Sequence, residues 1–368
     1  SAASDVYKRQ VGHWANTTAT FFRVLRRKAS EVFTMRETLV RETVNETLTI
    51  ATKSKRGDNI LMADQTNNDK LSDSVDISAL RVGVVGAGQM GSGIIEVAAR
   101  HGSDVVAWEA TQEFADKGLE RITKSLERGV SRGKLSEEEK DAALGRIRIT
   151  TDLEEFADRQ LVCEAIVENP EVKADIFRKL DQIVSDPDAP LCSNTSSLPI
   201  QQIASATSNP GRVMGLHFFN PVPVLPLVEH VRTLDTTDAV ADRAEKWASE
   251  VLKKTVIKAK DRSGFIVNFL LVPYLLSAIR MLENGVATKE DIDAGMRNGA
   301  AHPMGPIALS DMVGLDTVAS IADVMVDEYG DPTYACPSLL RRMVQAGRLG
   351  KKTGRGFYTY DEKGKPIR

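Results

Sequence analysis

Short apolar runs alternate with helix-length segments between Leu80 and Asp261, and this alternation constrains the fold more than any other feature. The strand-like runs are LRVGVV, DVVAW, RIRIT, LVCEAIV, PLCSN and RVMGLHF. Strands separated by helices form βαβ units, which build a parallel sheet with helices on both faces. After Asp261 only helical patterns remain. The sequence therefore predicts an α/β, doubly wound domain over residues 79–262 and an all-helical C-terminal domain over residues 263–368.

The first strand leads into a glycine-rich turn, RVGVVGAGQMGSG. Gly86 permits a tight turn, Gly88 lets backbone approach a pyrophosphate, and Gly91 lets the next helix pack closely on the strand. The following strand ends in Glu109, where a carboxylate accepts hydrogen bonds from a ribose. No Arg follows in ATQEF to bind a 2′-phosphate, so the pattern predicts a Rossmann-type domain that binds NAD rather than NADP. The alternative is a glycine-rich turn that binds nothing.

Composition excludes few classes of protein but disfavours several partners. The 368 residues carry a net charge of −3, which gives no reason to expect nucleic acid. The three cysteines, Cys163, Cys192 and Cys336, are odd in number and widely spaced. They indicate neither a disulfide framework nor a metal site, and they favour a reducing, cytoplasmic location.

The most apolar run, residues 264–282, is nearly long enough to span a membrane. Asn268, Pro273 and Arg280 interrupt it, which disfavours a membrane span. We expect instead a buried helix at a domain or subunit interface.

Residues 1–78 differ from the rest of the chain, because they are polar and show no sustained period. The first thirty residues are basic, as in a transit peptide, but no apolar core or small-residue cleavage motif is evident. We favour an N-terminal extension that is disordered or lies upstream of the native start, for which Met62 is a candidate.

The stretch GLHFFNPVPVLPLVE, residues 215–229, carries the main candidate for catalysis. Its prolines exclude a helix interior and a central strand, so this chain is extended or turning and follows a strand. His217 would then lie at the end of an element, and a histidine can accept an alcohol proton near neutral pH. Glu229 is a candidate to orient its ring. Equally, His217 could be a packed core residue and Glu229 a surface charge.

Two further segments carry candidate ligand contacts. Asn194, Ser196 and Ser197 follow a strand, at the end where open α/β sheets bind ligands, although a Ser-rich turn is more often a helix cap. Downstream of Glu109, a charged helical stretch gathers basic residues on one face, and such a face is usually just solvated. Its members are Lys117, Arg121, Lys124, Arg128 and Arg132.

Several motifs together resemble the 3-hydroxyacyl-CoA dehydrogenase family, and within it the stand-alone bacterial, notably actinobacterial, enzymes that act on 3-hydroxybutyryl-CoA. The resemblance covers about residues 80–360 and leaves the N-terminal segment without a counterpart. It rests on GLHFFNPVPVLPLVE, EAIVEN, SNTSSL, DRSGFIVN, HPMGP and GKKTGRGFY. It implies NAD-dependent oxidation of a short-chain (S)-3-hydroxyacyl-CoA, the reverse reduction of acetoacetyl-CoA, and a homodimer formed through the helical domain.

The same resemblance implies roles for individual residues. His217 would be the catalytic base and Glu229 the residue that holds it, while Ser196 and Asn268 would contact the reacting oxygen of the substrate. Ser125 and Arg132 would contact coenzyme A, although Lys124 or Lys134 could replace them. The cofactor contacts would be Ser196, Asn220, Glu168, Lys173 and Lys352, in addition to the glycine-rich turn and Glu109.

Two rival functions remain from the sequence. A related β-hydroxyacid dehydrogenase would share the fold and act on a free acid, but such enzymes commonly use a lysine base. A non-enzymatic, crystallin-like protein would bind NAD without turnover.

Overall fold

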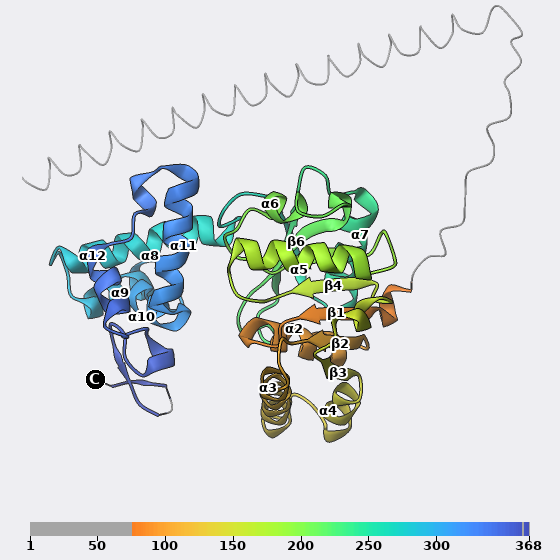
Figure 1. Ribbon diagram of the computed structural model, residues 1–368. Coiled ribbons are helices and arrows are strands. Elements are labelled where there is room, and N and C mark those ends of the chain that lie inside the picture. Colours follow the sequence, from red (N-terminus) through yellow and green to blue (C-terminus); the bar gives the residue numbers. More distant parts are fainter. Residues whose placement is uncertain (1–75, 363, 368) are drawn as a thin grey trace, which may run out of the picture. The chain divides into compact units, whose positions relative to one another are not determined.

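The computed structural model describes residues 76–362 and 364–367 (Figure 1). Met62 and residues 1–75 of the expected N-terminal extension lie outside the described residues. The described chain begins with the short helical turn η1, Ile77–Ala79, in which the Asp76 side chain accepts the Ser78 N–H.

An eight-stranded sheet forms the centre of the α/β part, in the order β3-β2-β1-β4-β5-β6-β7-β8. Strands β1 to β6 are parallel, β7 pairs antiparallel with β6, and β8 runs parallel to β7. The strands are β1 Arg81–Val85, β2 Asp104–Trp108, β3 Ile147–Thr150, β4 Leu161–Glu164, β5 Leu191–Ser193, β6 Val213–Phe218, β7 Leu227–Arg232 and β8 Thr255–Lys260. The order of the six parallel strands confirms the predicted doubly wound class.

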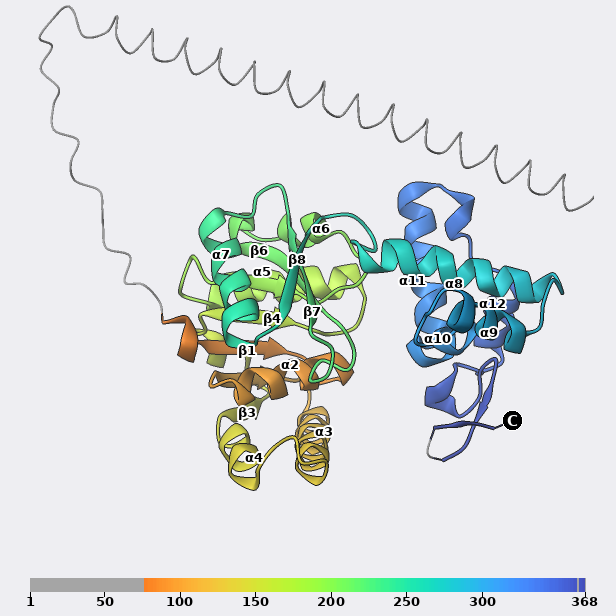
Figure 2. The same ribbon diagram turned by 180° about the vertical axis from the view of Figure 1, so that it is seen from behind.

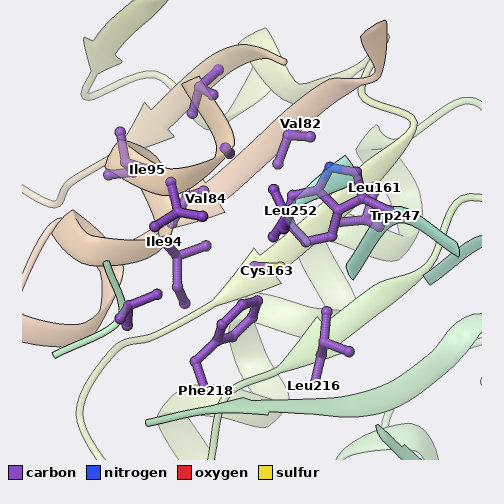
Figure 3. Close-up of a cluster of buried hydrophobic side chains, with 14 of the residues drawn as sticks. Val82, Val84, Ile94, Ile95, Leu161, Cys163, Leu216, Phe218, Trp247 and Leu252 are labelled. Atoms are coloured by element: carbon purple, nitrogen blue, oxygen red, sulfur yellow. The ribbon is translucent and has the colours of Figure 1, made fainter. Parts of the chain in front are cut away.

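Helices cover both faces of this sheet, with α5 on one side and α7 on the other (Figures 1 and 2). The helices of this part are α2 Gln89–Arg100, α3 Gln112–Ser131, α4 Glu137–Leu144, α5 Pro170–Ile183, α6 Ile200–Ala204 and α7 Asp238–Lys246, with a π-helical turn at Trp247–Val251 and the short turns η2 Leu153–Phe156 and η3 Pro210–Arg212. Each face has its own apolar core. Figure 3 shows the one beneath α2 and α7, where Trp247 and Phe218 pack edge to face with ring centroids 6.5 Å apart.

Three local expectations were wrong. Strands β7 and β8 were not recognised, because prolines precede β7 and β8 is a half-exposed edge strand without strict alternation. The long charged stretch is two helices rather than one. Gly133 breaks it with a φ of 66°, and Ser136 starts α4 through a capping box with Glu139.

Helices also make up most of the C-terminal part, around a separate apolar core. They are α8 Val267–Glu283, α9 Lys289–Gly299, α10 Pro306–Val313, α11 Leu315–Tyr329 and α12 Ser338–Gln345, with the turns η5 Pro332–Tyr334 and η6 Lys351–Thr353. The expected boundary at 262/263 falls in the connection between β8 and α8, which is neither helix nor strand. A two-stranded pair, β9 Thr359–Tyr360 and β10 Pro366–Ile367, is the one departure from the expected all-helical pattern in this described part.

Helix α8 corresponds to the most apolar run of the sequence. Val272, Leu275 and Ile279 are buried in the core, but Leu270 is 67% exposed, so the helix is less buried than expected. Within the described residues, no helix has the length and apolar character needed to cross a membrane.

The C-terminal segment is held onto the helices by two buried acids. Asp311 accepts hydrogen bonds from the backbone N–H groups of Phe357 and Tyr358, and Asp293 accepts one from the Tyr358 hydroxyl. Burial, the largest cause, raises the pKa of Asp311, and these donors oppose that rise. The clamp fixes the segment that carries Lys352.

Candidate active site

The glycine-rich turn joins β1 to α2 with the geometry that a dinucleotide needs. Gly86 has a φ of 93°, a conformation that favours glycine, and a Cβ on Gly91 would collide with the Gly86 carbonyl oxygen. Gly88 is the N-cap of α2, no side chain of the described residues caps it, and a Cβ there would meet open space. This uncapped helix N-terminus fits the pyrophosphate of a dinucleotide.

Glu109 follows β2 and lies against this turn. Its Oε1 accepts a hydrogen bond from the Ala87 N–H at 2.6 Å, which fixes the carboxylate beside the glycines. The acid expected to bind a ribose is therefore next to the expected pyrophosphate position. Arg121 of α3 donates to the Ala87 carbonyl at 2.7 Å, so this exposed member of the basic face also holds the turn.

His217 and Glu229 form a buried pair on the neighbouring strands β6 and β7, towards the β8 edge of the sheet. They are directly opposite in the antiparallel register of β6 and β7, and His217 Nδ1 is 2.8 Å from Glu229 Oε2. Glu229 is fully buried and His217 is 6% exposed. The alternative of a surface charge at Glu229 is therefore wrong.

The second oxygen of Glu229 contacts the start of α8. Oε1 accepts the N–H groups of Ile266 and Val267 at 3.0 and 2.9 Å. Phe265, in the preceding connection, has a φ of 45° and lies with its ring centroid 5.7 Å from that of His217. Glu229 thus holds the histidine and caps the helix that carries Asn268.

The turn after β5 is not the cap of the short helix α6. The N–H groups of Ile200 and Gln201 are accepted by the carboxylate of Asp261, at 2.8 and 2.6 Å. Asn194 instead accepts the Phe218 N–H at 2.8 Å, which ties this turn to the end of the histidine strand. The helix-cap interpretation of the Ser-rich turn is therefore wrong for α6.

Three ionic side chains lie beneath this turn. Lys173 Nζ is 2.6 Å from Glu164 Oε1 and 3.2 Å from Glu168 Oε2. Glu168 also accepts hydrogen bonds from the Thr195 hydroxyl, and from the Ser196 N–H at 3.2 Å. Glu168 and Lys173 were expected from the sequence, whereas Glu164, at the end of β4, was not.

A cavity of about 610 Å³ brings most of the expected residues together. It is lined by Ser196, His217, Asn220, Asn268, Glu168 and Lys173, among others. Glu229 lies behind His217. Lys352 is outside the lining but pairs, at 2.6 Å, with Asp316, which lines the cavity. The pairing of Asp316 with Lys352 could not be read from the sequence, because the two residues belong to different elements.

A second cavity of about 250 Å³ lies on the α3 arm and contains both residues expected to contact coenzyme A. Its polar lining includes Ser125, Arg132, Arg128, Lys134 and Arg100. Lys124 points elsewhere and pairs with Glu120 at 2.5 Å, so the predicted single basic face divides into ion-paired and cavity-lining members.

The proline-rich segment connects the two cavities. Asn220 lines the first, while Pro221, Pro223 and Val224 line the second. Lys254, from the loop before β8, donates to the carbonyls of Val222 and Leu225 at 2.6 and 2.8 Å. These bonds fix a stretch of chain that has no regular structure of its own.

The site combines a dinucleotide turn with a buried imidazole–carboxylate pair that faces a cavity. This combination suits hydride exchange between a nicotinamide and an alcohol, which is the chemistry of NAD-dependent dehydrogenases. Comparison with known families narrows this class. Residues 81–262 match the NAD binding domain of 3-hydroxyacyl-CoA dehydrogenase, and residues 264–360 match its C-terminal domain. The chain belongs to the 3-hydroxyacyl-CoA dehydrogenase family, and its cofactor is NAD.

Individual relatives agree with this assignment. The chain is 62% identical over 280 residues to a 3-hydroxybutyryl-CoA dehydrogenase of Mycobacterium tuberculosis, covering 76% of this chain and 98% of the relative. The crystal structure of M. tuberculosis FadB2 matches with 61% identity and a TM-score of 0.76, covering 77% of this chain and all of that one. The crystal structure of (S)-3-hydroxybutyryl-CoA dehydrogenase PaaH1 from Ralstonia eutropha matches with 42% identity and a TM-score of 0.72. The match covers 77% of this chain and all of that one.

The family resemblance seen in the sequence is thereby confirmed, and the chain is an NAD-dependent 3-hydroxyacyl-CoA dehydrogenase. The two rival functions, a free-acid dehydrogenase and a non-enzymatic NAD-binding protein, are set aside.

Proposed function

We propose that the enzyme oxidises short-chain (S)-3-hydroxyacyl-CoA to 3-ketoacyl-CoA, reduces acetoacetyl-CoA in the reverse direction, and uses His217 as its general acid and base. The observation that carries the proposal is the His217–Glu229 hydrogen bond of 2.8 Å at the wall of the larger cavity. The names of the M. tuberculosis and R. eutropha relatives, which specify 3-hydroxybutyryl-CoA, support the short acyl chain.

Glu229 orients the histidine. If Nδ1 donates its proton to Glu229 Oε2, Nε2 is left as the acceptor for the 3-hydroxyl proton of the substrate. The carboxylate then stabilises the imidazolium that forms, as in other histidine–carboxylate pairs. In the reverse reaction the same Nε2 returns the proton to the 3-oxygen.

Ser196 and Asn268 hold the reacting oxygen. Both line the cavity with His217, and both carry polar groups suited to stabilising charge on an oxygen. Two acids support their positions: the part-exposed Glu168 accepts the Ser196 N–H, and the buried Glu229 caps the helix that begins next to Asn268. Holding the oxygen from two sides also aligns C3 for hydride loss.

The cofactor site uses the glycine-rich turn and the side chains around it. Gly86, Gly88 and Gly91 would receive the pyrophosphate, and Glu109 would accept the ribose hydroxyl groups. Glu168, Lys173, Ser196 and Asn220 line the cavity on the nicotinamide side, with Lys352 behind Asp316. Bound NAD supplies the hydride acceptor for C3.

Coenzyme A would lie along the proline-rich segment. Ser125 and Arg132 would contact its phosphates in the second cavity, and Arg128 and Lys134 add positive charge there, whereas Arg100 is paired with Glu96 at 3.3 Å. The segment 220–224 would then guide the chain between the phosphates and the reacting carbon.

We also propose three properties of the whole molecule: a domain boundary at 262/263, a homodimer formed through the C-terminal domain, and a cytoplasmic location. Apolar side chains left exposed on and next to α8, including Ile266, Leu270 and Met281, support the dimer. Cys163 and Cys192 are opposite each other on β4 and β5 without a disulfide, which supports a reducing compartment. A monomer in light scattering would refute the dimer.

The decisive experiment follows NADH absorbance with acetoacetyl-CoA, beside NADPH and beside free acetoacetate. The proposal requires fast turnover that depends on both the CoA thioester and NADH. Equal rates with free acetoacetate would contradict the CoA-dependent site. An absence of turnover with intact NADH binding would contradict the proposed reaction.

A further inference from the structure

Glu164 is a buried acid that the mechanism above does not use. It stands at the carboxyl end of β4 and is fully buried. Its Oε1 accepts from Lys173 Nζ at 2.6 Å and from the Ile166 N–H at 2.7 Å, and its Oε2 accepts from the Ser193 hydroxyl at 2.7 Å. These three donors satisfy both oxygens of the buried carboxyl group.

This acid shares one ammonium group with a second acid. Lys173 is 1% exposed, and its Nζ lies between Glu164 and Glu168. Glu168 is part-exposed and lines the larger cavity. Two carboxylates and one ammonium leave the cluster with one unit of negative charge at the cavity wall.

The other charged groups around the cavity do not cancel this charge. Lys173 is the only Lys or Arg among the described residues that line it. Asp316 is balanced by Lys352, and the Glu229 carboxylate lies behind His217. Buried charges such as Glu164 and Glu229 are weakly screened by salt.

We propose that Glu164 is a positioning residue that acts through Lys173 and Glu168 to make the hydride-transfer site prefer the oxidised cofactor. The inference rests on the proposed function, because it requires the nicotinamide to lie in the cavity beside His217. The nicotinamide ring is positively charged in NAD⁺ and neutral in NADH. A fixed negative charge nearby stabilises the first form relative to the second.

The test compares dissociation constants for NAD⁺ and NADH, measured by fluorescence titration without substrate. Glu164→Gln removes the charge and keeps an acceptor in place, so the ratio Kd(NADH)/Kd(NAD⁺) should fall about tenfold. Glu168→Gln should lower the ratio in the same way. Lys173→Met removes the cation and should raise it.

Glu171→Gln is the matched control, because Glu171 is an exposed carboxylate in the first turn of the same helix, α5. In Glu171→Gln the ratio Kd(NADH)/Kd(NAD⁺) should stay at the wild-type value. A purely structural role of Glu164 would weaken both cofactors by the same factor and leave the ratio unchanged, which would overturn the inference. Opposite shifts in Glu168→Gln and Lys173→Met decide the matter even if Glu164→Gln does not fold.

Acetoacetyl-CoA turnover by the wild-type enzyme separates the two proposals. Normal turnover with a ratio that none of the three variants changes would overturn only the role of Glu164. No turnover would overturn the proposed function and, with it, the inference that depends on it.

Discussion

The cavity around His217 and the cavity beside α3 are built in different ways. Around His217, hydrogen bonds within the sheet fix key polar groups, as with the His217–Glu229 and Asn194–Phe218 hydrogen bonds. On the α3 arm, exposed side chains such as Arg128 and Arg132 supply the charge from a helix surface. The first arrangement suits a reaction that tolerates little displacement, and the second suits attraction of a flexible anion. Substitutions should therefore affect turnover in the first cavity and binding in the second.

The largest effect is expected from His217→Gln, which keeps a polar side chain but removes the proton acceptor. Turnover should fall by a factor of about 10² to 10⁴, because this is the usual contribution of general acid–base catalysis. NADH affinity, measured by fluorescence, should change little. Normal turnover in this variant would show that the buried pair is structural.

Glu229→Gln should come next, with a loss of about a hundredfold in kcat, since an amide can donate to Nδ1 and stabilise the wrong tautomer. The substitution also weakens the cap at Ile266 and Val267. Glu245→Gln serves as a control, because Glu245 pairs with Lys258 on the surface, at 2.9 Å. A kcat that falls equally in both variants would contradict the specific role of Glu229.

Arg132→Ala tests the second cavity and should raise KM for acetoacetyl-CoA about tenfold while kcat changes little. The difference in KM between wild type and Arg132→Ala should shrink at high salt, because the charges are exposed. Lys124→Ala is the matched control, since Lys124 lies on the same helix but pairs with Glu120 outside the cavity. A truncated acetoacetyl thioester without the nucleotide should not distinguish wild type from Arg132→Ala. If it does, this cavity does not bind the phosphates.

The smallest effect concerns His230, the neighbour of Glu229 on β7. His230 is 1% exposed, and burial lowers its pKa while its Nε2 lies 3.0 Å from the Ala241 carbonyl. As the pH falls through the ordinary histidine range, the unfolded chain binds a proton that the folded chain resists, so stability falls. Above that range the effect disappears.

Urea unfolding at pH 7.5 and pH 5.5 measures this loss of stability at lower pH. His230→Gln should lose less stability between the two pH values than wild type does, and an identical loss would contradict the role of His230.

Local patterns explain why much of the fold was predictable. The turn at Gly86 and the alternation up to β6 depend on residues close together in the chain, and so do the helices that follow. Strand β8 escaped prediction because its pairing with β7, rather than its own pattern, makes it a strand. The cap of α6 was missed because Asp261 lies far along the chain from the residues that it caps.

The sequence by itself determined the class of fold and the dinucleotide turn, because each depends on patterns with a local physical reason, and its family resemblance pointed to His217 as the candidate base. The tertiary structure decided which groups meet. Antiparallel register places Glu229 opposite His217, and the rotation of α3 separates Arg132 from Lys124. The hydrogen bond from the Ser193 hydroxyl on β5 to the buried Glu164 on β4 likewise joins residues that are distant in the chain. Such contacts come from packing between elements, and the spacing of residues along the chain does not encode them.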